Sequence, residues 1–426
     1  MFDWLRELSK TERRTLGAAF GGWAVDAMDF MVYTFVIPTL MAAWMMSKAE
    51  AGFIATATLI VSAIGGWLAG ILADRFGRVR ILQISILWFS IATFLCGFTN
   101  SYEQLLFLRA LQGLGFGGEW AVGSVLIAEM VRAKHRGKAV GTMQSGWAVG
   151  WGLAAILYAI AFSVLPEEYA WRVMFWVGVL PALLVLFIRR NVPETDLFHK
   201  TLEHVKKAGG KSHFLEIFGP KQIGITVLGC LLTTGMMAAY YAIVTWVPTY
   251  LKTVRGLTVL NTGGYSVVII VGSWFGFMTA AYLTDIIGRR KTFLLFATCT
   301  AIVALAYTTL PISNAAMLVL GFPLGFFVSG NFSGFGSYLA ELFPSRMRGS
   351  GQGFVYNTGR GLGAFAPPLV GYLGDHPPAW FGNFAWLVSQ PLALSIMVVS
   401  VAACALAMFT LIFLPETKGK ELQVFH

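Results

Sequence analysis

The feature that most constrains this chain is an apolar stretch, residues 17–44, that carries two carboxylates near its middle. A helix of about 20 apolar residues crosses the roughly 30 Å hydrocarbon core of a bilayer, so this stretch is long enough to span a membrane. Asp26 and Asp29 are three residues apart and therefore share one helix face. An Asp at the centre of a membrane helix costs about 2.5–3.5 kcal/mol. This face must therefore meet protein, water or a cation instead of lipid.

The overall composition also indicates a membrane protein. Hydrophobic residues make up 57% of the 426 residues and charged residues only 12%, whereas soluble domains carry about 25% charged residues. Twelve apolar runs are long enough to span a bilayer. They cover residues 17–44, 51–72, 81–99, 102–128, 139–163, 171–188, 222–251, 262–286, 293–312, 314–342, 352–374 and 392–414. The sequence predicts an all-α membrane protein with twelve transmembrane helices.

The basic residues predict how the chain is oriented. Of the 31 Lys and Arg residues, 25 lie in the N-terminal segment, in the connections from even to odd spans, or in the tail. The positive-inside rule then places both termini in the cytoplasm of a multi-pass protein of the plasma membrane, which in a bacterium is the inner membrane. The net charge of +10 follows from this topology, so no nucleic-acid partner is needed to explain it.

The chain divides into two halves of six spans each. Residues 1–188 form the predicted N-terminal six-helix bundle, and residues 222–426 form the C-terminal bundle with a short cytoplasmic tail. Residues 189–221 are charged and contain a Gly-Gly pair, as expected of a cytoplasmic linker.

Two motifs recur in both halves. GILADRFGRVR at 70–80 corresponds to AYLTDIIGRRK at 281–291, and VPET at 192–195 corresponds to LPETK at 414–418. Such repeats are typical of transporters built from two bundles related by a pseudo-two-fold axis, with the binding site between the bundles near the membrane midplane.

The first repeated motif predicts a switch between conformational states, since it lies in loops where one half can contact the other. An acid there can pair with basic groups or a helix N-terminus, and a glycine permits the tight turn. The predicted gating residues are Asp74, Arg75, Gly77, Arg78, Asp285, Gly288, Arg289 and Arg290.

Together with RALQGLGFGGEW at 109–120, these motifs resemble the major facilitator superfamily over essentially the whole chain. Within it, VDAMDF in the first span, GGEW in the fourth and WRVMFWVGVLPALLVLFIRRNVPET resemble proton-coupled organic-acid carriers. The similar carriers are sialate:proton symporters, fungal lactate permeases and shikimate-type metabolite carriers.

Arg109 is the first candidate partner for the acids of the first span. Counting along each helix places both Arg109 and Asp29 about 12 Å below the outer face. The resemblance implies that the acid of such a pair is the protonation site. An Arg neighbour favours the charged carboxylate and burial favours the neutral acid, so a pocket that wets and dries can load and release a proton. The alternative is a static buried pair that fixes two helices.

Asp26 and Glu119 are a second candidate for proton coupling. Both lie nearer the cytoplasmic side, and the two positions are at a similar depth. Two neighbouring carboxylates cannot both ionise cheaply, so one would hold a proton. The alternative for Glu119 is a hydrogen-bonded acid that contacts the cytoplasmic gate.

Arg360 predicts that the substrate is an anion. It lies about 12 Å deep in the eleventh span, and that span holds no acid before Asp375 at its far end. An unpaired Arg at this depth is unfavourable, whereas its planar guanidinium binds a carboxylate bidentately. The alternative is pairing with an acid of another span, for which Glu341 is the nearest candidate.

The remaining candidate substrate contacts are polar and aromatic side chains. The resemblance implies that spans one, four, seven and ten line the cavity, flanked by five, eight and eleven. A few polar groups among aromatic rings are typical of a small-molecule site. These residues are Tyr33, Gln144, Trp147, Tyr240, Tyr241, Asn331, Tyr356 and Asn357.

The sequence therefore predicts a secondary active transporter that takes up a small organic acid anion, a monocarboxylate, aromatic or sugar acid, together with a proton by alternating access. The alternatives are a facilitative or proton-linked carrier of a neutral sugar-like solute and a non-transporting nutrient sensor. An enzyme is disfavoured because no nucleophile and base set appears. We expect no cofactor and no metal, with the proton as the coupling ion, and a protein that functions as a monomer in the bilayer.

Overall fold

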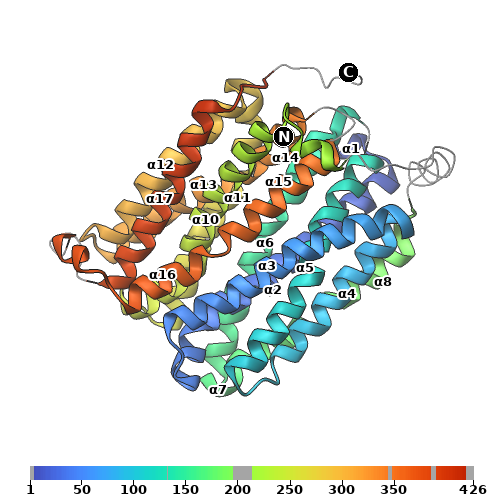
Figure 1. The fold of residues 1–426 in the computed structure, drawn as a ribbon. Coiled ribbons are helices and arrows are strands. Elements are labelled where there is room, and N and C mark those ends of the chain that lie inside the picture. Colours follow the sequence, from blue (N-terminus) through green and yellow to red (C-terminus); the bar gives the residue numbers. More distant parts are fainter. Residues whose placement is uncertain (1–3, 132, 195–213, 344–347, 385–389, 419–426) are drawn as a thin grey trace.

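The protein is a bundle of long helices. The computed structural model describes residues 4–131, 133–194, 214–343, 348–384 and 390–418 (Figure 1). The helices are α1 (Trp4–Glu7), α2 (Lys10–Trp44), α3 (Lys48–Phe76), α4 (Arg78–Cys96), α5 (Tyr102–Met130), α6 (Ala133–Val164), α7 (Glu167–Val177), α8 (Ala182–Asn191), η1 (Phe214–Phe218), α10 (Ile223–Thr253), α11 (Val259–Ile287), α12 (Arg289–Thr309), α13 (Asn314–Gly330), α14 (Phe332–Leu342), α15 (Arg348–Gly363), α16 (Ala366–Asp375), η3 (Ala379–Phe384) and α17 (Pro391–Phe413).

These helices account for the twelve predicted spans. Nine helical segments of the described chain are long and apolar enough to cross a membrane, and one of them comprises α13 and α14. The other three predicted spans correspond to α5, to α7 with α8, and to α15 with α16. Pro181 directly precedes α8 and Pro367 lies in the first turn of α16. Three spans are each divided into two helices, namely α7 and α8, α13 and α14, and α15 and α16. Proline lacks the backbone N–H that a continuous helix needs, which explains the first and the third of these breaks. The prediction of an all-α membrane protein is confirmed.

Helix packing repeats between the two halves. In the first half α2 packs on α6 and α3 on α5, and six spans later α10 packs on α15 and α11 on α13. Between the halves, α6 contacts α11, while α3 contacts both α15 and α16. These are spans five with eight and eleven with two, which a two-fold rotation exchanges. The packing therefore has the pseudo-two-fold relation that the repeated motifs predict (Figure 1).

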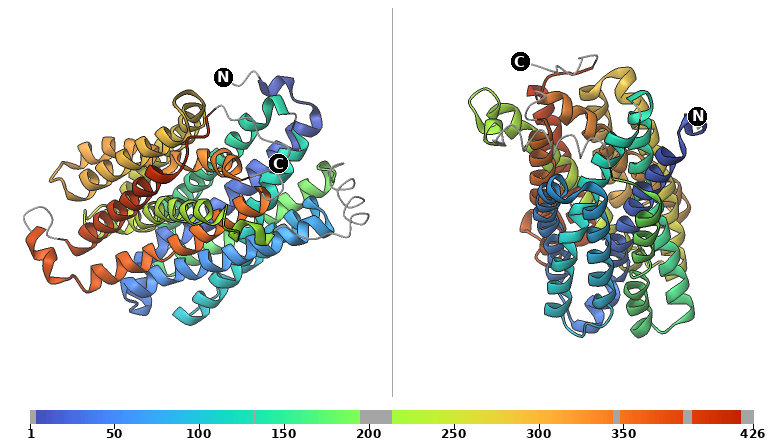
Figure 2. Two further views of the ribbon diagram at one scale, coloured as in Figure 1. Left: turned by 45° about the horizontal axis from the view of Figure 1, so that its top comes forward. Right: turned by 90° about the vertical axis from the view of Figure 1, so that its right-hand side faces the viewer.

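The described chain begins and ends at the same end of the bundle, here named the terminal face, and the other end is named the opposite face (Figure 2). The predicted linker at 189–221 falls largely on residues 195–213, which lie outside the described part. The domain boundaries placed at 188 and 222 therefore stay a prediction.

The repeated motifs meet at the terminal face. In the first half, Gly77 joins α3 to α4 with φ of +103°, a backbone conformation that favours glycine. The Glu194 carboxylate of the VPET segment accepts hydrogen bonds from the backbone N–H groups of Arg78 (3.0 Å) and Val79 (3.1 Å). Because these N–H groups begin α4 and have no partner within the helix, Glu194 caps that helix.

The second half repeats this arrangement. Gly288 joins α11 to α12 with φ of +105°, and Glu416 of the LPETK segment accepts hydrogen bonds from the N–H groups of Arg289 (3.0 Å) and Arg290 (3.1 Å). The Arg289 side chain also pairs with Glu341 at 3.0 Å. Glu416 and Glu341 both belong to the second half, so these contacts join helices within that half.

Three predicted gating side chains, those of Asp74, Arg75 and Asp285, lie outside the described part of the structure. The role of this motif as a switch stays a prediction.

Direct contacts join the halves at the opposite face. The Lys48 ammonium of α3 lies 2.7 Å from the Asp375 carboxylate of α16, and Asp375 also accepts a 3.2 Å hydrogen bond from the Ala49 N–H. A second ion pair joins Lys252 of α10 to Glu167 of α7 at 3.4 Å. Both pairs cross between the halves, so in this structure the opposite face is closed.

Replacing Asp375 with Asn should shift the protein toward a state open at the opposite face. The pair with Lys48 is partly exposed, so its loss is worth about 1 kcal/mol, or roughly a fivefold change in the ratio of states. Spin labels at Glu168 and Leu310, one on each half, would report a larger population of long distances. The control Glu341→Gln breaks a pair within one half and should leave the distance distribution unchanged.

The cap at Glu416 should make stability depend on pH. Partial burial acts to raise the pKa of Glu416, but four backbone N–H groups outweigh it and hold the pKa below its ordinary value. The cap therefore stabilises the fold above about pH 4.3, the unfolded pKa, and this contribution is lost as the pH falls through the lower folded pKa. Glu416→Gln should lower the melting temperature at pH 7 and less so below pH 4. The same scan on Glu168→Gln, at an exposed site, should show no such difference.

Candidate functional site

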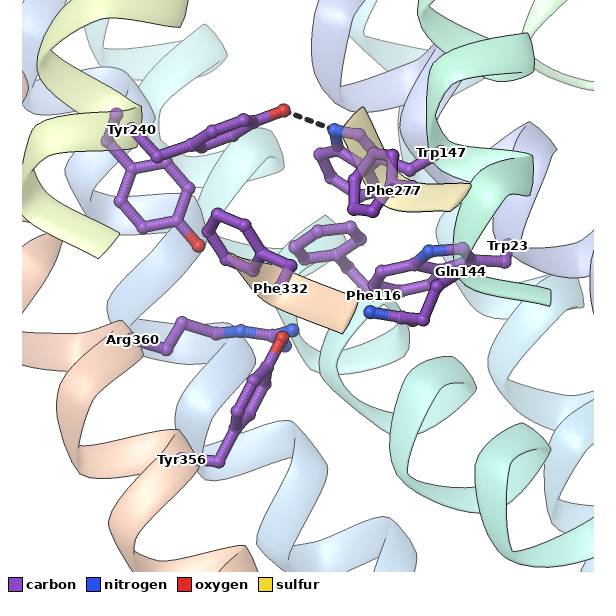
Figure 3. Close-up of a pocket in the computed structure, with 10 residues that line it drawn as sticks. Trp23, Phe116, Gln144, Trp147, Tyr240, Phe277, Phe332, Tyr356 and Arg360 are labelled. Atoms are coloured by element: carbon purple, nitrogen blue, oxygen red, sulfur yellow. Dashed lines mark hydrogen bonds between the residues drawn. The ribbon is translucent and has the colours of Figure 1, made fainter. Parts of the chain in front are cut away.

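A small cavity of about 20 Å³ lies between the two halves, deep in the bundle. Helices α2, α5 and α6 of the first half and α10, α11, α14 and α15 of the second supply these side chains (Figure 3). The lining residues are Trp23, Phe116, Gln144, Trp147, Tyr240, Tyr241, Phe277, Phe332, Tyr356 and Arg360.

Arg360 points into this cavity from α15 (Figure 3). Its residue is only 2% exposed, and its Nε and Nη1 atoms are buried without a hydrogen-bond partner in the described structure. The guanidinium carbon lies 5.3 Å from the ring centre of Phe116 and 5.2 Å from that of Tyr356. Aromatic faces attract a cation, but they do not satisfy its N–H donors.

The alternative partner for Arg360 is engaged elsewhere, since Glu341 pairs with Arg289. Arg360 therefore presents unsatisfied donors to the cavity, and such donors fit a planar anion.

Neutral polar groups lie across the cavity from Arg360. The Trp147 Nε1–H donates to the Tyr240 hydroxyl, which links α6 to α10 across the two halves (Figure 3). Gln144 accepts a 3.0 Å hydrogen bond from the Trp120 Nε1–H, and the Trp120 ring stacks on Tyr356 with ring centres 4.0 Å apart. The two halves thus meet at the cavity through aromatic rings and neutral hydrogen bonds.

Six of the nine predicted substrate contacts line the cavity, namely Gln144, Trp147, Tyr240, Tyr241, Tyr356 and Arg360.

The other three predicted contacts do not line it. The Tyr33 hydroxyl donates to the Ala51 carbonyl at 2.6 Å and so holds α2 to α3. Asn331 lies at the break between α13 and α14. The Asn357 amide donates to the carbonyl of Gly353, one turn earlier in its own helix, at 3.0 Å. Tyr33 and Asn357 therefore bond to backbone carbonyls, whereas Asn331 Oδ1 is buried without a hydrogen-bond partner in the described structure.

Sequence reasoning missed four aromatic lining residues, Trp23, Phe116, Phe277 and Phe332. One signal for two of them was present. Trp23 lies three residues before Asp26, and Phe116 lies three before Glu119, so each shares a helix face with a buried acid.

Arg109 and Asp29 lie together but do not form the expected ion pair. The Arg109 guanidinium donates to the backbone carbonyl of Asp29 (3.3 Å) and to the side chain of Gln112 (2.5 Å). The Asp29 carboxylate accepts from the Thr93 hydroxyl at 3.0 Å, and Gln112 in turn donates to Thr93 at 2.7 Å. The two charged groups are therefore joined through Thr93 and Gln112, with Tyr33 packed under the guanidinium at 5.1 Å. The network ties α2, α4 and α5 together.

Asp26 and Glu119 form a second buried acidic group. Both are fully buried, and none of their carboxylate oxygens has a hydrogen-bond partner in the described structure. Asp26 lies close enough to Glu119, Asp29 and Arg360 to interact electrostatically with each of them. A charge without a partner is unfavourable in such surroundings, so this arrangement favours a neutral, protonated acid.

The described residues contain no group of three or more His, Cys, Asp or Glu side chains that could hold a metal ion.

The position of Glu119 against the α2 backbone can be tested with a matched pair of glycines. A Cβ added at Gly22 would lie 2.3 Å from Glu119 Oε1, whereas one at Gly17 on the same helix meets nothing within 4 Å. Gly22→Ala should therefore lower the melting temperature and the transport rate, while Gly17→Ala should be neutral or stabilising by up to about 1 kcal/mol. Adding Glu119→Ala to Gly22→Ala should recover the melting temperature. A Gly22→Ala variant as stable and active as Gly17→Ala would contradict this packing.

Comparisons with known proteins agree with the fold. The family model described as the Major Facilitator Superfamily matches residues 19–366, with a second, overlapping match at 265–424. A probable 4-methylmuconolactone transporter of Cupriavidus pinatubonensis is 40% identical over 99% of this chain and 95% of that protein. The cis,cis-muconate transport protein of Acinetobacter baylyi is 34% identical over 84% of this chain and 86% of that protein.

The crystal structure of a D-xylose-proton symporter matches with a TM-score of 0.75 and 22% identity, covering 96% of this chain and 99% of that one. That similarity concerns the fold. The family model and the first relative both extend over nearly the whole chain. The chain therefore belongs to the major facilitator superfamily and is a multi-pass membrane transporter of that family, not an enzyme.

Proposed function

We propose that this transporter takes up a small organic acid anion together with a proton, by alternating access of the central cavity to the two sides of a bacterial inner membrane. The observation that carries the proposal is Arg360, a buried cation with unsatisfied donors at the wall of the cavity. A substrate carboxylate would supply both the missing hydrogen bonds and the missing countercharge.

The buried acids supply a route for the proton. Asp26 and Glu119 have no hydrogen-bond partners in the described structure, and Asp26 interacts electrostatically with Arg360. A carboxylate bound to Arg360 brings a further negative charge near Asp26 and reduces the stabilisation that Arg360 gives it. Both effects favour protonation of Asp26, so binding of the anion promotes binding of the proton.

The Asp29 and Arg109 network is the other candidate for the coupling site. Protonation of Asp29 would weaken its interaction with Thr93, and the change would pass through Gln112 to Arg109. Because the network joins three helices of the first half, a proton there could alter how that half packs.

The contacts at the opposite face suggest where the protein lies in its cycle. With both termini in the cytoplasm, as the basic residues predict, the opposite face is the periplasmic side. The ion pairs of Lys48 with Asp375 and of Lys252 with Glu167 then close the periplasmic entrance. Substrate entry requires these pairs to open while the halves rock about the cavity. The described contacts leave a single chain complete as a transport unit, in keeping with a monomer in the bilayer.

The names of the relatives support an organic acid as the substrate class. The two relatives compared above are named for a muconolactone and for muconate, and both of these compounds carry a carboxylate. A neutral sugar-like solute is disfavoured because it offers no countercharge to Arg360, although the fold matches a xylose symporter. A sensor that does not transport is likewise disfavoured, because both relatives compared above are named as transport proteins.

Transport assays on the purified protein in weakly buffered liposomes test this proposal. Addition of 4-methylmuconolactone or a similar carboxylate should alkalinise the external medium as substrate and protons enter. Three acid replacements, Asp26→Asn, Asp29→Asn and Glu119→Gln, are tested singly and together. The variant that removes the proton-coupling acid should reduce uphill accumulation at least 10-fold while substrate exchange continues. Arg360→Ala should abolish both, because it removes the binding group.

Lys418→Ala serves as a control, since it removes a cation near the terminal face and away from the cavity. Accumulation that survives all three acid replacements would rule out proton coupling at these residues. Transport of carboxylates that is unaffected by Arg360→Ala would rule out its role in binding.

A further inference from the structure

Among the described residues that line the cavity, Arg360 is the single charged side chain. Of the ten lining residues, eight are aromatic, one is Gln144 and one is Arg360. Aromatic walls desolvate a ligand, and a charged group in such a place needs a partner of opposite charge. Among the described lining residues, only Arg360 can neutralise a negative charge on a ligand.

A second buried cation, Arg109, belongs to the hydrogen-bonded network with Asp29. The Arg109 guanidinium donates to Gln112 and to the Asp29 carbonyl and lies against the Tyr33 ring, and Arg109 is not among the lining residues. The remaining buried charged groups near Arg360 are acids, since Asp26 interacts electrostatically with both Arg360 and Glu119. A second negative charge on the ligand would therefore find no compensating cation among the described lining residues.

The walls on either side of Arg360 are flat. Its guanidinium lies over the rings of Phe116 and Tyr356, and Tyr356 is held by its stack on Trp120, whose ring is nearly parallel at 8°. The Tyr241 and Tyr356 hydroxyls also hydrogen-bond with this guanidinium, but its Nε and Nη1 atoms have no partner in the described structure and are available to a carboxylate. A planar ligand can stack on these rings, and little side-chain entropy is lost on binding because the rings are already in place.

The far side of the cavity provides neutral groups only. Gln144, the Trp147 Nε1–H and the Tyr240 hydroxyl lie there, the last two hydrogen-bonded to each other (Figure 3). An amide, an indole N–H and a phenol can bind a hydroxyl, a carbonyl or a lactone oxygen. They do not neutralise a carboxylate.

We propose that the cavity selects planar, unsaturated acids that carry one carboxylate, and rejects ligands of similar shape that carry two. The carboxylate lies on Arg360, the unsaturated plane lies against the rings of Phe116 and Tyr356, and an uncharged oxygen lies toward Gln144 and Trp147. This inference rests on the proposed function and narrows it, since it specifies that the bound anion carries one carboxylate.

Two pairs of compounds test the count of charges. Muconolactone and cis,cis-muconate are isomers that differ in carrying one and two carboxylates, and benzoate and terephthalate form an aromatic pair of the same kind. Affinities of the purified full-length protein for all four should be measured by titration calorimetry at pH 7.5, together with neutral benzamide. We expect each monocarboxylate to bind at least 10-fold more tightly than its dicarboxylate partner, and benzamide to bind weakly.

A variant that adds a second cation provides the reciprocal test. Gln144→Lys places an ammonium across the cavity from Arg360 and should raise the affinity for cis,cis-muconate and terephthalate at least 10-fold relative to their partners. Gln144→Met removes the same hydrogen bond to Trp120 without adding charge and should leave the preference for one carboxylate in place. Thermal unfolding of both variants checks that each is folded, and the comparison on the unaltered protein stands without them.

The outcomes separate this inference from the function on which it rests. If dicarboxylates bind as tightly as monocarboxylates and Arg360→Ala weakens both, the site is an anion site but the count of charges is wrong. If no carboxylate binds, or if benzamide binds as well as benzoate and Arg360→Ala changes nothing, both the proposed function and this inference are overturned. A preference for monocarboxylates that is lost with Arg360→Ala supports both.

Discussion

The structure depends on how ionisable side chains are kept inside a bundle surrounded by lipid. Arg109, Arg360, Asp26, Asp29 and Glu119 are all at most 2% exposed. Moving such groups from water into a low-dielectric interior is unfavourable by several kcal/mol each, unless partners compensate. The protein meets this constraint in two ways. Arg109 and Asp29 are joined into a hydrogen-bonded network, although Arg109 Nε and Nη2 and Asp29 Oδ1 still lack partners in the described structure. Arg360 instead lines the cavity, and the carboxylates of Asp26 and Glu119 have no hydrogen-bond partner in the described structure.

This difference separates structural from functional charge. The network of Arg109, Gln112, Thr93 and Asp29 joins α2, α4 and α5 through hydrogen bonds. In the function proposed above, Arg360 accepts an anion, and Asp26 or Glu119 accepts a proton. Because Arg360 interacts electrostatically with Asp26, the two ligands are linked through a single guanidinium. Transport against a gradient requires a link of this kind, since each ligand must bias the binding of the other.

Much of the fold could be predicted from the sequence, and the site only in part. The twelve apolar runs and the repeated motifs predict the helices and their symmetry, and counting residues from the span ends correctly brings Arg109 beside Asp29. The expected ion pair is absent because Thr93 and Gln112 stand between the charged groups. Thr93 lies on the third span, which nothing in the sequence associates with the first. Depth along a helix follows from residue number, but neighbours across helices depend on packing.

The sequence by itself determined the number of membrane spans and the presence of charged residues within them, because apolar length and residue type are properties of each segment alone. Only the tertiary structure decided which way each helix is turned. It placed Trp23, Phe116, Phe277 and Phe332 on the cavity and turned Tyr33 toward the backbone of α3. The physical reason is that a helix inside such a bundle is apolar on most of its faces. Its rotation is therefore set by close packing against its neighbours.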